Sequence, residues 1–349
     1  MMKLSDYTLA LLDDIERRID PDAEEDFRAQ WKNFWYTDLD IPVFTPYRKT
    51  VSQPGTELKN ININDALGDP ELMLDAELID LSRRLSSASA ALGIRANYGS
   101  AIMTSLFGAE MFIMPRETNT LPTTRSFNDS DRIRKVLETG IPDFRVGFGG
   151  DVLAFGEMCA EIFENYPKIK KYVEVYHPDT QGPLDIAELL WGGEMFYEMY
   201  DDPEFVHAVM RLITDTYRGF MDKWFSIIPK REEIAVHWHI MQRGTIFLRM
   251  DSAMNLSPEF YREYSRPYDT ELLDYYGGGC MHFCGRGEHF VESLCEIESL
   301  YAIQMSQPHL NDMDKILSSV VSHDKRILML FGAGRYADRP YMRNGVMHS

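Results

Sequence analysis

The stretch that decides the fold is "GGGCMHFCGRGEHF", residues 277–290. Within it, the apolar run "GGCMHF" ends in the polar, glycine-rich loop "CGRG". A short run of this kind, bounded by turn residues, is typical of a β-strand. Because cysteine and histidine gather in the run, it is either a strand that carries a metal site or a core strand rich in soft residues.

Strand-like runs of the same kind recur along the chain, each followed by a polar or glycine-rich loop. They are "GIRANY" (93–98), "KYVEVY" (171–176), "EIAVHW" (233–238), "LYAIQM" (300–305) and "RILMLF" (326–331). Their alternation with helical stretches predicts parallel strands joined by helical crossovers. A doubly wound sheet also places polar residues at carboxyl strand ends. We favour a (β/α)8 TIM barrel because these ends are spread along the whole segment.

The first ninety residues differ, because they are mainly helical. Two of their helical stretches open with Asp20-Pro21 and Asp69-Pro70, where aspartate caps free backbone amides and proline suits the first helical position. Asp202-Pro203 and Ser257-Pro258 repeat this opening later in the chain. The sequence predicts an N-terminal helical extension over residues 1–92 packed on a barrel over 93–349, best treated as a single domain.

Composition narrows the class of protein. The 349 residues carry a formal net charge of -19, which argues against nucleic acid or an anionic membrane as the main partner. The acidic N-terminal stretch lacks a signal-peptide core, and no apolar run reaches the length of a membrane span. We therefore expect a cytoplasmic protein with a small-molecule substrate, and the sequence leaves homo-oligomerisation open. Four cysteines are too few for a disulfide framework in this chain.

His282 and Cys284 are the main candidate metal ligands. On a strand, residues two apart share a face, with Cα atoms about 6.5 Å apart, so both side chains can reach one cation. Cys280 has the same parity but lies about 13 Å from Cys284 along a strand, which predicts a packing role. Imidazole and thiolate suit zinc, and a catalytic zinc needs three protein ligands and one open position.

The run "HWH" offers a third ligand. If His237 and His239 share a strand face, and if that strand neighbours the one with His282, strands about 4.8 Å apart would let His239 reach the same metal. The ordinary alternative is that both are hydrogen-bonded histidines of the core or cleft. Without other support that alternative is favoured, and a single His-x-Cys pair is also a weak motif.

A loop between two prolines, "YHPDTQGPLD", residues 176–185, supplies the candidate catalytic residues His177, Asp179 and Gln181. Rigid loops dense in donors and acceptors suit ligand positioning. An equally good alternative is a capped entry to a helix beginning near Leu184, with Asp179 or Thr180 bonding local amides.

Cationic and amide groups near other strand ends are candidates for binding a carboxylate or phosphate of the substrate. Isolated surface ion pairs would explain the arginines among them equally well. These candidates are Arg95, Asn97, Tyr98, Gln242, Arg243, Arg249 and Arg286.

The chain resembles the uroporphyrinogen decarboxylase superfamily. The resemblance runs from about Ile94 to Gly334 through "RANYGS", "HPDTQGPLDIAELLWG", "DDPEFVHAVMRLIT", "LSPEFYREYSRPY" and "MHFCG". Its most specific part is "SPEFYREYSRPY" followed by "HFCG". The resemblance implies a (β/α)8 barrel and one of two activities: cofactor-free decarboxylation of uroporphyrinogen, or zinc-assisted methyl transfer from a corrinoid (cobamide) protein to a thiol.

The decarboxylase branch carries an arginine-rich motif near its N-terminus, which neutralises a substrate with eight carboxylates, and this chain has no equivalent there. The methyltransferase branch binds zinc through a His-x-Cys pair, matched by His282 and Cys284, and a distant C-terminal cysteine. No cysteine follows Cys295. His239 is the preferred replacement, with Asp251 as an alternative ligand.

The sequence thus predicts a zinc-dependent methyltransferase-like enzyme that moves a methyl group between a corrinoid carrier protein and a thiol or other small acceptor. One alternative is a decarboxylase-like lyase acting on a polycarboxylate tetrapyrrole, which needs no metal and has a strongly basic cleft. The other is a barrel that binds a tetrapyrrole or a corrinoid protein without catalysis.

Overall fold

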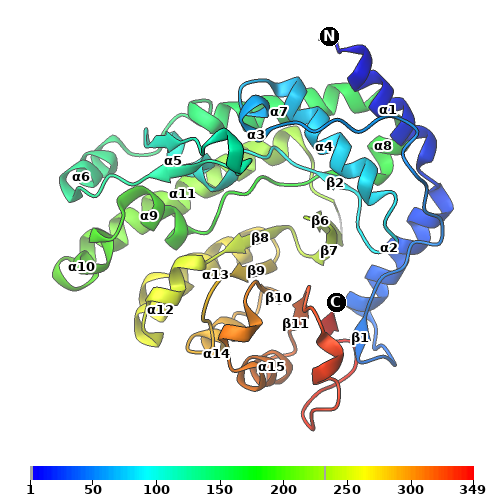
Figure 1. Cartoon of the computed structure of the whole chain (residues 1–349). Helices are drawn as coiled ribbons and strands as arrows, with labels where there is room; N and C mark the ends of the chain where they lie inside the picture. Colours follow the sequence, from blue (N-terminus) through cyan, green and yellow to red (C-terminus); the bar gives the residue numbers. More distant parts are fainter. Residues whose placement is uncertain (1–2, 232) are drawn as a thin grey trace.

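The computed structural model describes residues 3–231 and 233–349 and has the predicted α/β class. Its main sheet has six strands, all paired in parallel. Their order is β1 (Val43–Phe44), β12 (Met347–His348), β11 (Arg326–Leu328), β10 (Leu300–Met305), β9 (Gly279–Phe283) and β8 (Ile246–Arg249). Figure 1 shows this sheet in the lower half of the molecule. The predicted parallel arrangement is therefore confirmed for this part of the chain.

The remaining strands pair separately. They are the parallel pair β2 (Gly93–Ile94) and β5 (Glu174–Val175), the hairpin β3 (Glu110–Phe112) and β4 (Thr123–Arg125), and the hairpin β6 (Ile234–His237) and β7 (Ile240–Arg243). Across the described residues, the strand pairings form these four sheets and no closed barrel.

The predicted strands are all present, and the structure adds others. The run "TIFLR", residues 245–249, contains β8, and from this run the sequence suggested only Arg249, as a group near a strand end. Two further strands, β1 and β12, are two residues long, which is too short to give a periodic signal. β8 matters most because Arg249, its last residue, lies opposite His282 in the sheet register, and His282 lies opposite Gln304 on β10.

The N-terminal helices follow the predicted pattern. They are α1 (Asp6–Arg18), α2 (Pro21–Tyr36), α3 (Ile63–Ala66) and α4 (Pro70–Arg84). Asp20 and Asp69 cap α2 and α4 by accepting backbone N–H bonds, and the following proline occupies the first turn in each case. Asp202 and Ser257 cap the later helices α11 (Pro203–Ile227) and α12 (Pro258–Tyr264) in the same way. The four predicted openings are thus confirmed.

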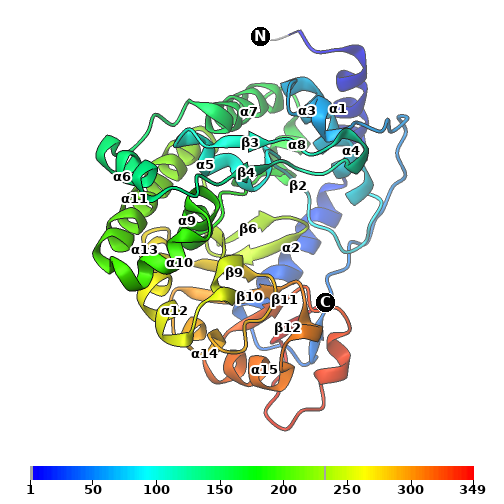
Figure 2. The same cartoon turned by 60° about the vertical axis from the view of Figure 1, so that its left-hand side comes forward.

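The other helices lie mainly outside the strands, as Figure 2 shows for α7, α11, α14 and α15. They are α5 (Ile102–Leu106), α6 (Ser130–Thr139), α7 (Gly147–Phe163), α8 (Pro167–Tyr172), α9 (Pro183–Trp191), α10 (Glu194–Asp201), α11 (Pro203–Ile227), α12 (Pro258–Tyr264), α13 (Arg266–Tyr275), α14 (Val291–Cys295) and α15 (Met313–Ser322). None of the helices in the described part of the chain is long and apolar enough to cross a membrane.

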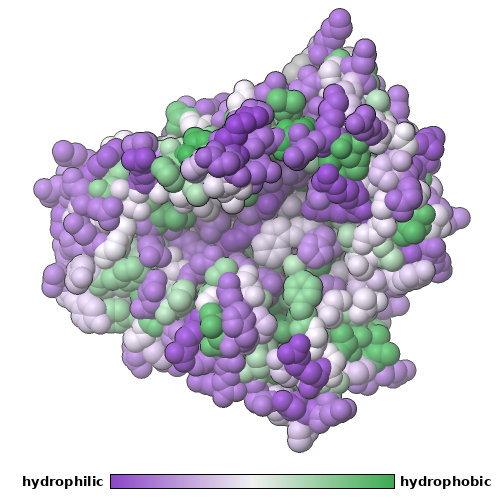
Figure 3. Space-filling model, viewed as in Figure 1, coloured by the Kyte–Doolittle hydropathy of each residue, from purple (hydrophilic) through white to green (hydrophobic). Residues whose placement is uncertain are grey.

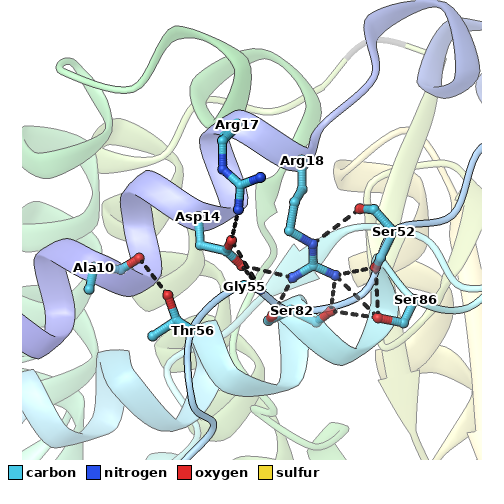
Figure 4. A network of polar contacts seen from close by, with 9 residues as sticks. All are labelled: Ala10, Asp14, Arg17, Arg18, Ser52, Gly55, Thr56, Ser82 and Ser86. Atoms are coloured by element: carbon cyan, nitrogen blue, oxygen red, sulfur yellow. Dashed lines mark hydrogen bonds and ion pairs between the residues drawn. The ribbon is translucent and has the colours of Figure 1, made fainter.

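A buried arginine holds α1, α4 and the irregular segment between α2 and α3 together. Arg18 on α1 is 8% exposed and donates to Asp14, to the Ser82 hydroxyl and carbonyl on α4, and to Ser52 between them (Figure 4). Because a buried guanidinium is stable only with its donors satisfied, this network sets how α1, α4 and the irregular segment pack together. The position of α4 is important because one face of it lines the cavity described below.

Candidate metal centre and the adjoining cavity

Three side chains at the carboxyl ends of β8 and β9 form a group suited to a cation. The ligand atoms of Asp251, His282 and Cys284 all lie within 4.8 Å of one another. The His282 Nε2 atom is 3.3 Å from the Cys284 sulfur and 3.4 Å from Asp251 Oδ1. Carboxylate, imidazole and thiolate are ligands that zinc accepts, and three protein ligands leave one position open.

Backbone contacts hold Asp251 in this group. Its Oδ1 accepts the Cys284 backbone N–H at 2.6 Å, which ties the end of β8 to the end of β9. Asp185, on the first turn of α9, accepts the N–H groups of Asp251 at 3.0 Å and Ser252 at 2.8 Å, one on each carboxylate oxygen. Burial and the nearby charge of Asp251 raise the pKa of Asp185 to about 7.

Gln304 on β10 fixes which nitrogen of His282 is available to a metal. Its amide nitrogen donates to the Met305 carbonyl at 3.1 Å, so its oxygen accepts the N–H at Nδ1 of His282. The Nε2 lone pair then faces Cys284 and Asp251. A hydrogen bond to the distal nitrogen is the usual way that proteins orient a metal-binding histidine. Burial lowers the pKa of His282, which favours the neutral ring.

Cys284 and Cys280 lie in different surroundings, as the spacing predicts. Cys280 is fully buried among the side chains packed around β6, β7 and β9, and burial raises the pKa of its thiol. Cys284 is only partly buried, in contact with His282. Burial also raises the pKa of Cys284, so it is a neutral thiol until a cation is bound.

The structure corrects the interpretation of "HWH". β6 ends at His237 and β7 begins at Ile240, so Trp238 and His239 form the tip of an antiparallel hairpin rather than part of one strand. Trp238 has the left-handed φ of 53° that such a tight turn requires. The hydrogen-bonded neighbours of the strand with His282 are β8 and β10, not β6.

The two histidines of the hairpin consequently differ. His237 is fully buried, stacked on Phe247 at 4.6 Å, and its Nε2 is 4.0 Å from Asp179. His239 lines the same cavity as His282 but lies outside the group of three ligand atoms. The group contains Asp251, the alternative third ligand that the sequence offered.

A cavity of about 530 Å³ adjoins the metal group. Figure 3 shows the molecule hollowed between the part that carries α4 and the part that carries the six-stranded sheet. Residues from seven regions of the chain meet there, and its size suits a small-molecule ligand. The lining comprises Ala76, Glu77, Asp80, Arg84, Arg95, Asn97, Tyr176, Trp238, His239, His282, Gln304, Ser306 and Met329.

Asp179 contacts two predicted substrate-binding residues, of which Arg95 lines the cavity and Arg249 does not. It forms ion pairs with Arg95, at 2.6 Å, and with Arg249. Burial and the nearby Arg95 lower the pKa of Arg249 to about 9, so Arg249 still carries its charge at neutral pH. Asp179 therefore binds two cations, and α9 begins after Gly182 without a side-chain cap. Asp179 is therefore not a helix cap, and the ligand-positioning interpretation of the loop stays a prediction.

The other two candidate catalytic residues, His177 and Gln181, have contacts or backbone conformations that stabilise the loop itself. The N–H at Nδ1 of His177 donates to the Pro178 carbonyl, and Nε2 accepts the Phe247 N–H, each at 2.9 Å. With both nitrogens engaged and burial lowering its pKa to about 4, His177 holds its loop against β8. Gln181 is buried and has a left-handed φ of 65° at the loop's turn.

Only two of the seven predicted substrate-binding residues, Arg95 and Asn97, line the cavity. Arg243 lies over the Tyr301 ring at 4.0 Å, near the amino end of β10, because β7 runs antiparallel and returns the chain to that end of the sheet. Arg286 is exposed and paired with Glu288. Tyr98 and Gln242 are buried away from the lining.

Four residues of the cavity lining were not predicted as site residues: Glu77, Asp80, Arg84 and Gln304. The sequence contained a usable signal for Gln304. Gln304 is the next-to-last residue of the predicted strand 300–305 and lies opposite His282 in the sheet register. The α4 residues gave no such signal, because the helix was predicted as part of an extension packed on the barrel and not as a wall of the cavity.

Comparisons with known proteins give a fold and no family. The sequence matches no family model and no curated protein. The structure is similar to that of a methyltransferase from Methanosarcina mazei, with a TM-score of 0.57 and 14% sequence identity, over 86% of this chain and 80% of that chain. At 14% sequence identity, the similarity shows a shared fold and nothing more.

Proposed function

We propose that the chain is a methyltransferase with a (β/α)8-like fold, in which Asp251, His282 and Cys284 bind zinc and a small thiol receives a methyl group from a corrinoid carrier protein. The observation that carries the proposal is the group of three ligand atoms within 4.8 Å of one another, at the edge of a cavity. The likeness to a methyltransferase fold supports it.

The residues fit zinc in three respects. Their nitrogen, sulfur and oxygen donors are of the types that zinc accepts, and their number leaves one position for a ligand from the cavity. Gln304 directs the Nε2 lone pair of His282 toward the other two donors. Zinc, when bound, would lower the pKa of an acceptor thiol and so supply a thiolate at neutral pH.

The surrounding side chains have defined tasks in this reaction. Asp185 and the Cys284 backbone hold Asp251 in place, while Gln304 holds the His282 ring. In this reaction the acceptor thiol would lose its proton to water, and its sulfur would form the new bond to the methyl carbon. The carbon–cobalt bond of the donor would break, and its electron pair would stay with the corrinoid.

The cavity supports this activity over decarboxylation of a polycarboxylate. Its charged lining side chains are two acids, Glu77 and Asp80, and two arginines, Arg84 and Arg95. A substrate with many carboxylates needs an excess of cations, and the acids would repel it.

A turnover assay tests the proposal. Zinc-loaded protein is mixed with methylcobalamin and 2-mercaptoethanol, the cobalt absorbance is followed, and the thioether is measured by mass spectrometry. We expect thioether formation in the wild type and in Cys280→Ala, and its loss in Cys284→Ala. Absence of thioether from zinc-loaded wild type would overturn the proposed activity.

A further inference from the structure

One face of α4 forms the wall of the cavity that adjoins the metal group. Ala76, Glu77, Asp80 and Arg84 all line it, and their spacing places them on neighbouring turns of a single helix face. Arg95, which follows β2, lines it as well, and so does His282. A ligand close to His282 would therefore share one cavity with charged groups of both signs.

The two arginines of the lining are engaged to different extents. Arg84 pairs with Asp80 at 2.7 Å and donates to the carbonyls of Gly93 and Trp238, so its guanidinium is used to hold α4 against the hairpin tip. Arg95 uses only Nη1, toward Asp179. Within the described part of the chain, Nε and Nη2 of Arg95 make no hydrogen bond, and they remain available to a ligand.

Two acceptors lie beside Arg95. The Oε2 atom of Glu77 accepts the Arg95 backbone N–H at 3.0 Å, while Oε1 has no hydrogen-bond partner among the described residues. Asn97 lies two residues beyond Arg95 and also lines the cavity, but its Oδ1 is closed to solvent and has no partner. Oε1 of Glu77 is therefore the acceptor open to a ligand, and it favours a ligand that donates hydrogen bonds.

We propose that the acceptor is zwitterionic, a small thiol that carries an ammonium and a carboxylate in the manner of an α-amino acid. Oε1 of Glu77 receives the ammonium, and the free N–H groups of Arg95 receive the carboxylate. This inference rests on the proposed function and specifies its substrate class.

The ionisation of Glu77 is consistent with this assignment. Burial raises the pKa of its carboxyl, and the charge of Arg95 opposes that effect. An ammonium group placed against the carboxyl favours the ionised form. A purely anionic thiol would instead meet Glu77 and Asp80 as like charges.

Four thiols of similar size test the substrate class: L-cysteine, cysteamine, 3-mercaptopropionate and 2-mercaptoethanol, which differ mainly in charge. Their binding to zinc-loaded protein is measured by calorimetry. We expect L-cysteine to bind most tightly, about 10- to 100-fold more tightly than 2-mercaptoethanol, from charge-assisted hydrogen bonds at both ends. Binding of 3-mercaptopropionate as tightly as L-cysteine would overturn the inference.

A variant separates recognition by the protein from chelation of zinc by the amino group of the ligand. Glu77→Gln should weaken L-cysteine and cysteamine about tenfold or more and leave 3-mercaptopropionate unchanged or tighter. Glu204→Gln, an exposed acid-to-amide change at the start of α11, is the matched control and should change none of the four. Equal affinity of L-cysteine for wild type and Glu77→Gln would contradict the inference. Failure of all four thiols to bind would overturn the proposed function itself.

Discussion

The backbone N–H of Cys284 donates to Oδ1 of Asp251 at 2.6 Å, across the ends of two neighbouring parallel strands. This bond brings together a carboxylate and a thiol that are thirty-three residues apart in the sequence. His282 lies on β9, two residues before Cys284, so the bond places three different kinds of metal ligand at one edge of the sheet.

The first prediction concerns the third ligand. Asp251→Ala removes one of three donors and should lower zinc affinity at least about 100-fold, as measured by competition with a chromophoric chelator. His239→Ala should leave the affinity within about threefold of wild type, because His239 lies outside the group of ligand atoms. The opposite ranking of the two variants would make His239 the ligand and remove Asp251 from the account.

The second prediction concerns Gln304, which accepts the Nδ1 proton of His282. Gln304→Leu leaves that ring free to turn and should weaken zinc binding about 10- to 100-fold. Folding should persist, because leucine is similar in size and apolar. Gln304→Glu is the informative companion, since a carboxylate can still accept the same hydrogen bond and should retain tight binding. Unchanged zinc affinity in the leucine variant would show that Gln304 does not orient the ring.

The third prediction separates packing from metal binding. Cys280 is fully buried in the core, so Cys280→Ala should lower the free energy of unfolding by about 1 kcal/mol in a denaturant titration. The same variant should bind zinc like wild type. A loss of zinc from Cys280→Ala that exceeds the loss from Cys284→Ala would reverse the roles assigned to the two cysteines.

The fourth prediction concerns stability and pH. Burial raises the pKa of Glu174 from 4.5 to about 7, and its Oε2 accepts the Val236 N–H at 3.0 Å. Between these two pKa values the folded chain binds more protons at this site than the unfolded chain, so stability falls as pH rises through this window. Glu174→Gln keeps the acceptor and removes the charge. It should therefore be more stable than wild type above pH 7, on the order of 1–3 kcal/mol.

Urea titrations of both proteins at several pH values measure this difference. The gap between Glu174→Gln and wild type should widen from about pH 4.5 to pH 7 and then level off. A gap that is constant over this range would mean that Glu174 has the same pKa in both states.

How far the sequence could predict the site depends on particular elements. His282 and Cys284 were predicted correctly as neighbours because strand geometry alone places residues two apart on one face. The group around Asp251 could not be derived in full, because β8, the strand before it, was not identified from the sequence. Without that strand, nothing in the sequence placed Asp251 beside Cys284.

The turn between β6 and β7 and the role of α4 at the cavity could not be predicted from the sequence, each for a different reason. "HWH" alternates as a strand would, and only the left-handed φ of Trp238 reveals a turn in a sequence without glycine at that point. α4 was correctly predicted as a helix, but its role as a cavity wall depends on how Arg84 contacts Trp238 and Gly93 from a different part of the chain. The superfamily resemblance and the identities of methyl donor and acceptor stay predictions.

The most direct test of the central claim is the zinc content of purified protein, measured by elemental analysis after dialysis against zinc and then against metal-free buffer. The account predicts about one zinc per chain in wild type and in Cys280→Ala, and almost none in Cys284→Ala. Wild type that retains no zinc, or a Cys284→Ala variant that retains as much as wild type, would contradict it.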